Sequence, residues 1–282
     1  MRSLISLDPI DYLVIGHITC DVTPQGPRIG GTACYAGLTA HALGLRVGIV
    51  TSWANNLPLG PLEDIPIANF PTEQSTTIEN ISTQGGRVQL VHSVAPALDI
   101  NIIPEPWKTT PIVHLGPVAQ EVEPGLIRYF PTSLIGLTPQ GWLRSWSADG
   151  LVHHTEWPEG SFLLGQAGAV VISVEDVDSN EEIIEEMAGY SRILAVTEAA
   201  HGARLYWNGD VRRFRPPVVT EVDDTGAGDI FAAVFFARLH ATRDPWEAAR
   251  LATLLSAISV TRPGLEGIPT AEEIKESMIE VI

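Results

Sequence analysis

Apolar residues occur along the chain in short unbroken runs, and helix-like segments separate these runs. Residues 11–22 (DYLVIGHITCDV) form a flat apolar stretch rich in β-formers, which is typical of a strand buried on both faces. Small, helix-compatible residues follow over 30–44, with Gly44 at the C-cap, and residues 45–53 have the pattern of the next strand. This order predicts a β-loop-helix-β unit.

The alternation resumes further along the chain. Short apolar runs predict strands at residues 111–116, 134–141, 169–174, 192–199 and 218–222. Polar and apolar residues at helical spacing predict helices at residues 179–190, 226–240, 245–261 and 271–282. Strands that alternate with helices predict an α/β fold of three layers, with a mostly parallel central sheet flanked by helices.

Two segments have a different, hairpin-like pattern. Residues 76–94 alternate around Gln84-Gly85-Gly86, and residues 203–217 turn at Asn208-Gly209. The first hairpin interrupts the α/β alternation and predicts a small β insertion. Because no internal repeat, low-complexity tract or linker is present, we expect residues 1–282 to form a single domain.

Composition limits the class of protein. The 282 residues are 45% hydrophobic and 18% charged, which is typical of a globular protein. The two cysteines, Cys20 and Cys34, make no disulfide framework, so a reducing compartment is expected. The N-terminus lacks the pattern of a secretory signal, and no run of 18 apolar residues occurs. We therefore expect a cytoplasmic protein without a membrane partner.

Charge excludes further classes. The formal net charge of −17 argues against nucleic acid as a partner, because phosphate backbones need a basic face. The two lysines, Lys108 and Lys275, do not follow a glycine, which excludes a Walker-type phosphate loop. Any phosphate chemistry must therefore use backbone amides, a metal ion or arginine.

The most informative segment is residues 223–233, DDTGAGDIFAA. Residues 218–222 before it have the pattern of a strand and the residues after it that of a helix, so Gly226-Ala227-Gly228 forms a strand-to-helix turn. Amides at such a helix start have no intrahelical acceptor and, together with the helix dipole, form an anion site. A dinucleotide-binding fingerprint is excluded because Phe231 stands where it needs a small residue.

Asp229 distinguishes a phosphate-binding turn from a reaction centre. A carboxylate beside a bound phosphate would repel it, unless the group that the carboxylate faces is a hydroxyl that loses its proton. Phosphoryl transfer uses this arrangement, with amides and Mg²⁺ for the developing charge and an acid that takes the proton. The alternative is an ordinary acidic residue in the first turn of a helix.

The segment DDTGAGDIFAAVFF resembles the C-terminal signature of the ribokinase-like (PfkB-type) carbohydrate kinases. The resemblance extends to GHITCDV and RIGGTACYAGLTAHALG near the N-terminus, to TTIENISTQGGRVQ at the lid strands, to AVTEAAHGARLY at the nucleotide turn and to AISVTRPG near the adenine. These segments occur in family order along nearly the whole chain. The resemblance implies the ribokinase-like fold, with a lid formed by residues 17–28 and 76–95.

The resemblance also implies roles for individual residues. Asp229 matches the catalytic base, and Gly226, Ala227 and Gly228 match the anion hole for the transferred phosphate. Substrate hydroxyls would bind at Asp21 and near the Gly30-Gly31-Thr32 segment, where the lid flexes. A carboxylate suits this task because it only accepts hydrogen bonds, and hydroxyls donate them.

The segments that match the family's ATP- and Mg²⁺-binding segments follow the family pattern less closely. Thr197, Glu198, Ala199 and Gly202 match the turn that binds ATP, together with Gly226 and Gly228, although alanine replaces the first glycine of that turn at 199. The family's Asn-x-x-Glu, which organises Mg²⁺, appears as SVED, so Asp176 is the candidate metal residue.

Features near the acceptor differ from those of many sugar kinases. Tyr35 stands where they carry an asparagine, and GLTPQGW resembles a subgroup that includes inositol kinase-like members. This resemblance makes Gln140 a candidate substrate-binding residue. We therefore expect an ATP- and Mg²⁺-dependent kinase, a monomer or homodimer, that phosphorylates an alcohol of a sugar, polyol or cyclitol. Two alternatives stay open, a nucleoside kinase, in which Tyr35 or Trp53 stacks on a base, and a non-catalytic binding protein on the kinase scaffold.

Overall fold

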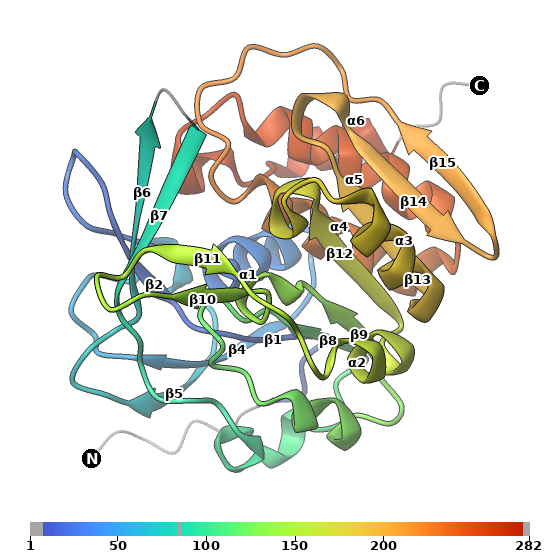
Figure 1. Cartoon of the computed structure of the whole chain (residues 1–282). Coiled ribbons are helices and arrows are strands. Elements are labelled where there is room, and N and C mark those ends of the chain that lie inside the picture. The colour runs from blue at the N-terminus through green and yellow to red at the C-terminus, as the bar shows by residue number, and fades with distance from the viewer. Residues whose placement is uncertain (1–7, 84–85, 279–282) are drawn as a thin grey trace.

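The computed structural model describes residues 8–83 and 86–278, and within them one large sheet forms the centre of the molecule (Figure 1). Its nine described strands are β1 (Tyr12–Ile15), β4 (Val47–Trp53), β5 (Ile67–Pro71), β8 (Ile112–Leu115), β9 (Leu134–Leu137), β12 (Ala169–Ser173), β13 (Ile193–Thr197), β14 (Ala203–Trp207) and β15 (Asp210–Phe214). They lie in the order β15-β14-β13-β12-β9-β8-β1-β4-β5. The pairs from β13 to β5 are parallel, and only β14 and β15 run antiparallel to their neighbours.

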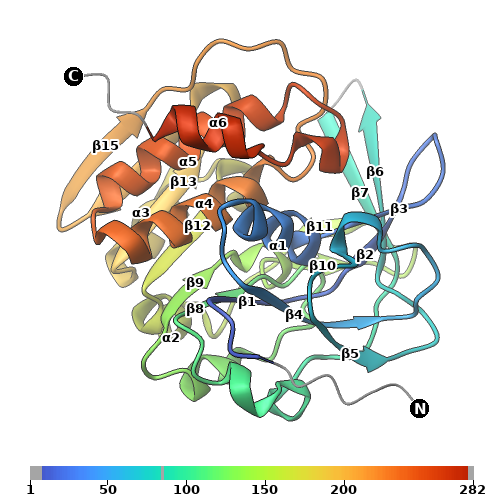
Figure 2. The same ribbon diagram turned by 180° about the vertical axis from the view of Figure 1, so that it is seen from behind.

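Helices cover both faces of this sheet. They are α1 (Thr32–Ala42), α2 (Gly160–Gln166), α3 (Glu181–Tyr190), α4 (Ala227–Thr242), α5 (Pro245–Ser259) and α6 (Ala271–Ser277). Figure 1 shows α2 and α3 on one face, and Figure 2 shows α1, α4, α5 and α6 on the other. The predicted three-layer α/β architecture with a mostly parallel sheet is therefore confirmed.

Each sheet face packs against its own hydrophobic core. In β1, Tyr12 and Val14 face the core that contains α1, α4 and α5, whereas Leu13 and Ile15 face the core of α2 and α3. All four side chains are fully buried, which explains why this strand has no polar alternation. Helix α4 is apolar around its whole circumference because the sheet, α1 and α5 enclose it.

Local signals fix where several helices begin. The side chain of Asn180 accepts hydrogen bonds from the first backbone amides of α3, and Asp244, followed by Pro245, does so for α5. Helix α6 starts with a capping box between Thr270 and Glu273. The predicted starts of these three helices lie within two residues of the observed ones.

A second sheet contains the segments assigned to the lid. It has the order β3-β2-β6-β7, from β2 (Thr19–Val22), β3 (Arg28–Gly30), β6 (Thr77–Thr83) and β7 (Gly86–Ser93). Figures 1 and 2 show β6 and β7 extending away from the helical layers. Both predicted hairpins are confirmed, although Gln84 and Gly85, at the turn of the first, lie outside the described residues.

Some sequence expectations were wrong or incomplete. Residues 218–222 form no strand, because Val218 and Val222 are exposed and their segment crosses the surface as an extended loop. The amides of Val222 and Asp223 bond instead to the Val260 carbonyl at the end of α5. We did not predict β5, α2 or the small hairpin of β10 (Arg144–Trp146) and β11 (Val152–His154).

Residues 279–282, the end of the last predicted helix, lie outside the described residues. Among the residues described, no helix combines the length and the apolar character that a membrane span requires.

Phe236 packs helix α4 closely against strands β8 and β9 of the central sheet. A Cβ added to Gly136 of β9 would lie 2.4 Å from the Phe236 ring, and the ring also meets His114 edge-on at 5.0 Å. We expect Phe236→Ala to lower the free energy of unfolding by about 3–5 kcal/mol, because a buried aromatic ring leaves a cavity. Urea denaturation measures this change.

The matched control is Tyr190→Ala, since Tyr190 is an aromatic residue at a helix end that is 50% exposed. We expect the control to change stability by less than about 1 kcal/mol. Equal losses in the two variants would contradict the packing described for α4.

Candidate active site

The candidate active site lies where helices α1 and α4 begin, beyond the carboxyl ends of the parallel strands. This edge of an open α/β sheet is where ligands bind in such folds. After β1 the chain enters the second sheet and returns to α1, so that sheet stands beside the same edge. The fold thus brings residues from both ends of the sequence to one place.

The glycine turn at the start of α4 has the shape of an anion site. Gly226 has φ +81°, and a Cβ there would lie 2.1 Å from the Tyr35 ring, so only glycine fits. Gly228, in contrast, faces open space, with no atom within 4 Å of an added Cβ. A ligand can therefore approach the backbone closely at Gly228.

The amides of this turn differ in their availability. Ala227 donates its N–H to the Asp224 carbonyl at 3.1 Å, and the first intrahelical bond runs from Ile230 to Gly226. No side chain caps α4. The amides of Gly228 and Asp229, at the second and third helical positions, therefore have no acceptor within the helix. Within the predicted anion hole, the amides of Gly228 and Asp229 are therefore the ones that can bind an anion.

Asp229 is a partly exposed carboxylic acid with a shifted pKa. Burial of the carboxyl group among protein atoms raises its pKa to about 6, and the charges of Asp176 and Asp21 act in the same direction. A hydrogen bond from Thr32 and the positive charge of Arg144 oppose the shift. Asp229 is therefore ionised at neutral pH yet holds a proton far more strongly than an exposed aspartate.

Asp21 is held rigidly beside the glycine pair. It is buried, and its Oδ1 accepts a hydrogen bond of 2.6 Å from the Thr19 hydroxyl. A Cβ on Gly30 would lie 2.0 Å from Asp21 Oδ2, and Gly31 has φ +81° with the His17 carbonyl 2.7 Å from its Cβ position. The two glycines are thus needed for Asp21 to fit and for the chain to turn into α1.

Thr32 links the acceptor side to the base. As the first residue of α1, it directly follows Gly31, and its methyl group packs against Gly116 at the end of β8. Its hydroxyl lowers the pKa of the Asp229 carboxyl group, so the two side chains lie near each other. We predicted Thr32 as a substrate residue, and the structure places it against the catalytic candidate.

Asp176 lies in a polar cluster near Asp229. Its Oδ2 accepts from the Ser173 amide at 2.8 Å, and its Oδ1 accepts from Gln140 Nε2 at 3.0 Å. Arg144 of β10 lies 4.0 Å from Oδ1. Gln140, predicted to bind substrate, is thus directed at Asp176. Sequence reasoning missed Arg144, because a lone arginine in an unpredicted hairpin gives no signal.

The site offers few side chains that could bind a metal ion. Over residues 8–83 and 86–278, no three histidine, cysteine, aspartate or glutamate side chains group as a metal site. Mg²⁺ at phosphoryl-transfer sites needs only one or two carboxylates, because water and substrate phosphates supply the other ligands. The residues around Asp176 fit that requirement.

The predicted donor turn follows β13. Ala199 takes up φ +48°, a glycine-like conformation, so the turn persists although alanine replaces glycine. Gly202 has φ +93°, and a Cβ there would lie 1.9 Å from the Phe214 carbonyl. Thr197 Oγ1 bonds to the Ile172 carbonyl, and Glu198 forms ion pairs with Arg204 and Arg213 at 2.6 and 2.8 Å.

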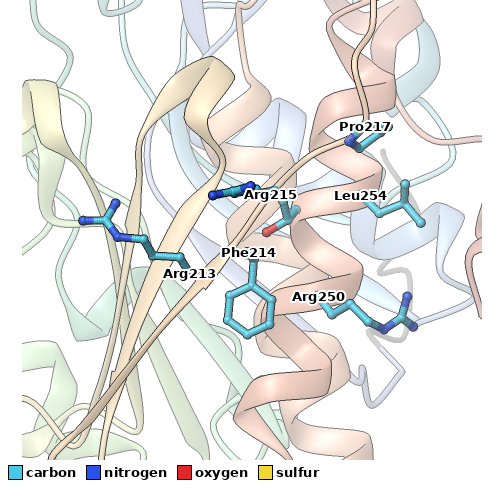
Figure 3. Close-up of a pocket in the computed structure, with 7 residues that line it drawn as sticks. Arg213, Phe214, Arg215, Pro217, Arg250 and Leu254 are labelled. Atoms are coloured by element: carbon cyan, nitrogen blue, oxygen red, sulfur yellow. The ribbon is translucent and has the colours of Figure 1, made fainter.

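Two surface hollows flank this turn. One, of about 420 Å³, is lined by Glu198, His201, Arg213 and Arg215 among others. The second, of about 330 Å³, lies between β15 and α5 (Figure 3). Figure 3 shows the side chains of Arg213 and Arg250 pointing away from each other, so these arginines do not converge on one anion.

Two aromatic residues considered for base stacking are not available for it. Tyr35 and Trp53 are each only 1% exposed, and the Tyr35 ring lies beneath Gly226. In the hairpin of β14 and β15, Arg212 lies over the Trp246 ring at 4.1 Å. These side chains pack in the fold and present no platform for a base.

The sequence is similar to those of known kinases. Residues 156–271 match the family model described as pfkB family carbohydrate kinase. The chain is 31% identical over 254 residues to an inositol 3-kinase of Zea mays, which covers 89% of this chain and 65% of that enzyme. It is 25% identical over 263 residues to a cytidine kinase of Thermococcus kodakarensis, covering 86% and 93% respectively.

The fold is also found among solved structures. A sulfate complex of a pyrophosphate-dependent kinase in the ribokinase family superposes with a TM-score of 0.79 at 17% identity, over 95% of this chain and 100% of that one. The architecture is therefore ribokinase-like. The family match over residues 156–271, the relatives and the fold all liken the chain to the pfkB family of carbohydrate kinases.

Proposed function

We propose that the protein transfers a phosphoryl group from ATP to an alcohol of a sugar, polyol or cyclitol, with Asp229 as the base. The observation that carries this proposal is the position of Asp229. It stands in the first turn of α4, beside backbone amides without acceptors, and its pKa is raised to about 6. A base with a pKa near the working pH combines ionisation with affinity for the proton.

The proposed reaction follows from where the acid and the backbone amides at the start of α4 lie. Asp229 accepts the proton of the incoming hydroxyl, and the Gly228 and Asp229 amides stabilise charge on the transferred group. Thr32 holds the Asp229 carboxylate in place through its hydroxyl. Arg144 adds positive charge at the same edge and partly offsets the acids Asp21 and Asp176.

Asp176 is the residue that would hold Mg²⁺. Both of its oxygens already accept hydrogen bonds, so we infer that it contacts the ion through the ion's water shell. When bound, Mg²⁺ neutralises charge on the donor phosphates. Gln140 and Ser173 fix the orientation of the Asp176 carboxylate for this task.

The donor would bind along the turn of Thr197, Glu198, Ala199 and Gly202 and reach the start of α4. Support comes from the glycine-like backbone conformation of Ala199 in this turn and from the two hollows beside it. The structural neighbour described as pyrophosphate-dependent makes inorganic pyrophosphate the second donor to be tested.

For the acceptor, the observations favour a polyol or cyclitol over a nucleoside. Asp21 offers its carboxylate to hydroxyl groups, whereas Tyr35 and Trp53 are buried and leave no ring face for a base. The inositol 3-kinase relative supports this choice, and the cytidine kinase relative supports the alternative. The sheet of β2, β3, β6 and β7 would cover the acceptor and exclude water.

The first test combines activity and stability in one variant. We expect Asp229→Asn to lower kcat by about 10²–10⁴-fold, because the general base is lost. The same variant should raise the free energy of unfolding at pH 8 by about 1–3 kcal/mol, because the folded state no longer holds a desolvated carboxylate. A coupled assay for donor consumption and urea denaturation measure the two effects.

Asp178→Asn serves as the matched control, since Asp178 lies on the surface after the 3₁₀ turn Val174–Val177. We expect it to leave both quantities nearly unchanged. Near-normal turnover in Asp229→Asn would remove the base assignment, and a loss of stability would indicate a structural role instead.

The pH dependence gives an independent test. Because the pKa of Asp229 is raised to about 6, the base is protonated in acid, and kcat/KM should fall about tenfold per pH unit below pH 6. The profile should be flat from about pH 7 to 8. An activity that stays constant down to pH 5 would contradict the assignment.

Donor and acceptor are identified by a panel assay. ATP and pyrophosphate would each be combined with inositols, pentoses, hexoses and nucleosides at fixed Mg²⁺. We expect the highest kcat/KM with ATP and a cyclitol or polyol. A higher kcat/KM with a nucleoside would favour the nucleoside kinase, and no turnover with any pair would favour a binding protein.

A further inference from the structure

Arg28 of β3 connects the second sheet to the glycine turn. Its Nη1 lies 3.5 Å from Asp223 Oδ2, and its Nη2 lies 3.4 Å from Thr225 Oγ1. In the antiparallel pairing of β2 with β3, Arg28 stands directly opposite Asp21. One side chain thus extends from the predicted substrate-binding strand pair to the residue that precedes Gly226.

Asp223 is the other half of this connection. Its Oδ1 accepts the Thr225 amide at 2.9 Å, and its Oδ2 accepts the Gly264 amide at 2.8 Å. These bonds fix the backbone immediately before Gly226 and tie it to the loop after α5. Arg28 supplies positive charge to a carboxylate whose other partners, the Thr225 and Gly264 amides and the Thr225 side chain, are neutral.

The surroundings are shaped around the guanidinium group. A Cβ on Gly264, which has φ +49°, would lie 2.8 Å from Arg28 Nη1, so a larger residue would displace the arginine. Among the described residues, the buried Arg28 Nε and the buried Tyr35 hydroxyl have no hydrogen-bond partner. The contacts to Asp223 and Thr225, at 3.5 and 3.4 Å, are longer than the 2.7–3.2 Å that is usual for N–H···O hydrogen bonds. The connection is therefore formed but has room to tighten.

We propose that Arg28 is a positioning residue that couples the lid strands to the anion hole. When the second sheet moves toward the acceptor, β3 moves with it. Arg28 then draws Asp223 and Thr225 along, and these residues orient the Gly226 turn that follows them. The amides that stabilise the transferred group are then fully aligned only when the acceptor is covered. This inference rests on the proposed phosphoryl transfer and adds a coupling between its two halves.

Kinetics of Arg28 variants test the coupling. We expect Arg28→Ala to lower kcat by about 10–100-fold, since a small displacement of a catalytic group has effects of this size. The KM for the donor should change much less, because the amides act mainly on the transition state. Arg28→Lys should retain more activity than Arg28→Ala, as it keeps the charge but not the two-point contact.

Chemical rescue distinguishes a missing cation from general damage. Guanidinium chloride, far below denaturing concentration, should restore part of the kcat of Arg28→Ala, whereas urea, its neutral planar analogue, should not. Arg46→Ala is the matched control, because Arg46 forms an exposed ion pair with Asp11 away from the site. It should keep wild-type kcat and show no response to guanidinium.

A second readout does not depend on turnover. Hydrogen exchange of the amides in residues 223–228 should be faster in Arg28→Ala than in the wild type and in Arg46→Ala. The double variant Arg28→Ala/Asp223→Ala should be no slower in turnover than Asp223→Ala alone, because both remove one interaction.

The outcomes separate the two proposals. Unchanged exchange in residues 223–228, or additive kinetic effects in the double variant, would overturn the coupling. If the wild type itself shows no turnover with any donor and acceptor, the proposed function fails, and the exchange measurement alone decides whether Arg28 orders the turn.

Discussion

The candidate site depends on one close approach, that of the start of α4 to the side of α1. The Tyr35 ring lies against the backbone of Gly226 with no space for a side chain between them. The same packing puts Thr32, the first residue of α1, close enough to Asp229 to lower the pKa of its carboxyl group. It also fixes the left-handed conformation from which α4 begins, so the amides of Gly228 and Asp229 point outward rather than into a preceding turn.

A desolvated carboxylate at this place has opposite effects on folding and on chemistry. Burial makes the ionised form of Asp229 costly, and the neighbouring acids add to the cost. Thr32, Arg144 and the start of the helix offset part of it. The balance leaves an acid that is ionised at neutral pH and still attracts a proton, which is the property that a general base requires.

The architecture and the centre of the site could be predicted from the sequence, because both depend on patterns within short segments. Unbroken apolar runs such as that of β1 reveal a doubly covered parallel sheet, and GAGD marks a helix start without a capping side chain. The strand expected at residues 218–222 was wrong because its β-branched residues lie on the surface, where no neighbouring strand pairs with them. Arg28, Arg144 and the Thr32 hydrogen bond could not be found, since each depends on packing between segments far apart in the chain.

The groups that set the pKa of Asp229 are widely spaced in the sequence. Asp21 lies in β2 and Thr32 begins α1, both near the N-terminus of the chain. Asp176 follows β12 near the middle of the sequence, and Asp229 lies in α4, after the hairpin of β14 and β15. No shorter stretch than 21–229 contains all four, so a fragment or a partly synthesised chain that ends before Asp229 cannot assemble the centre. Under the proposed function, such an incomplete chain would consume no phosphoryl donor, and reactivity would arise only after the last of the four residues has joined the fold.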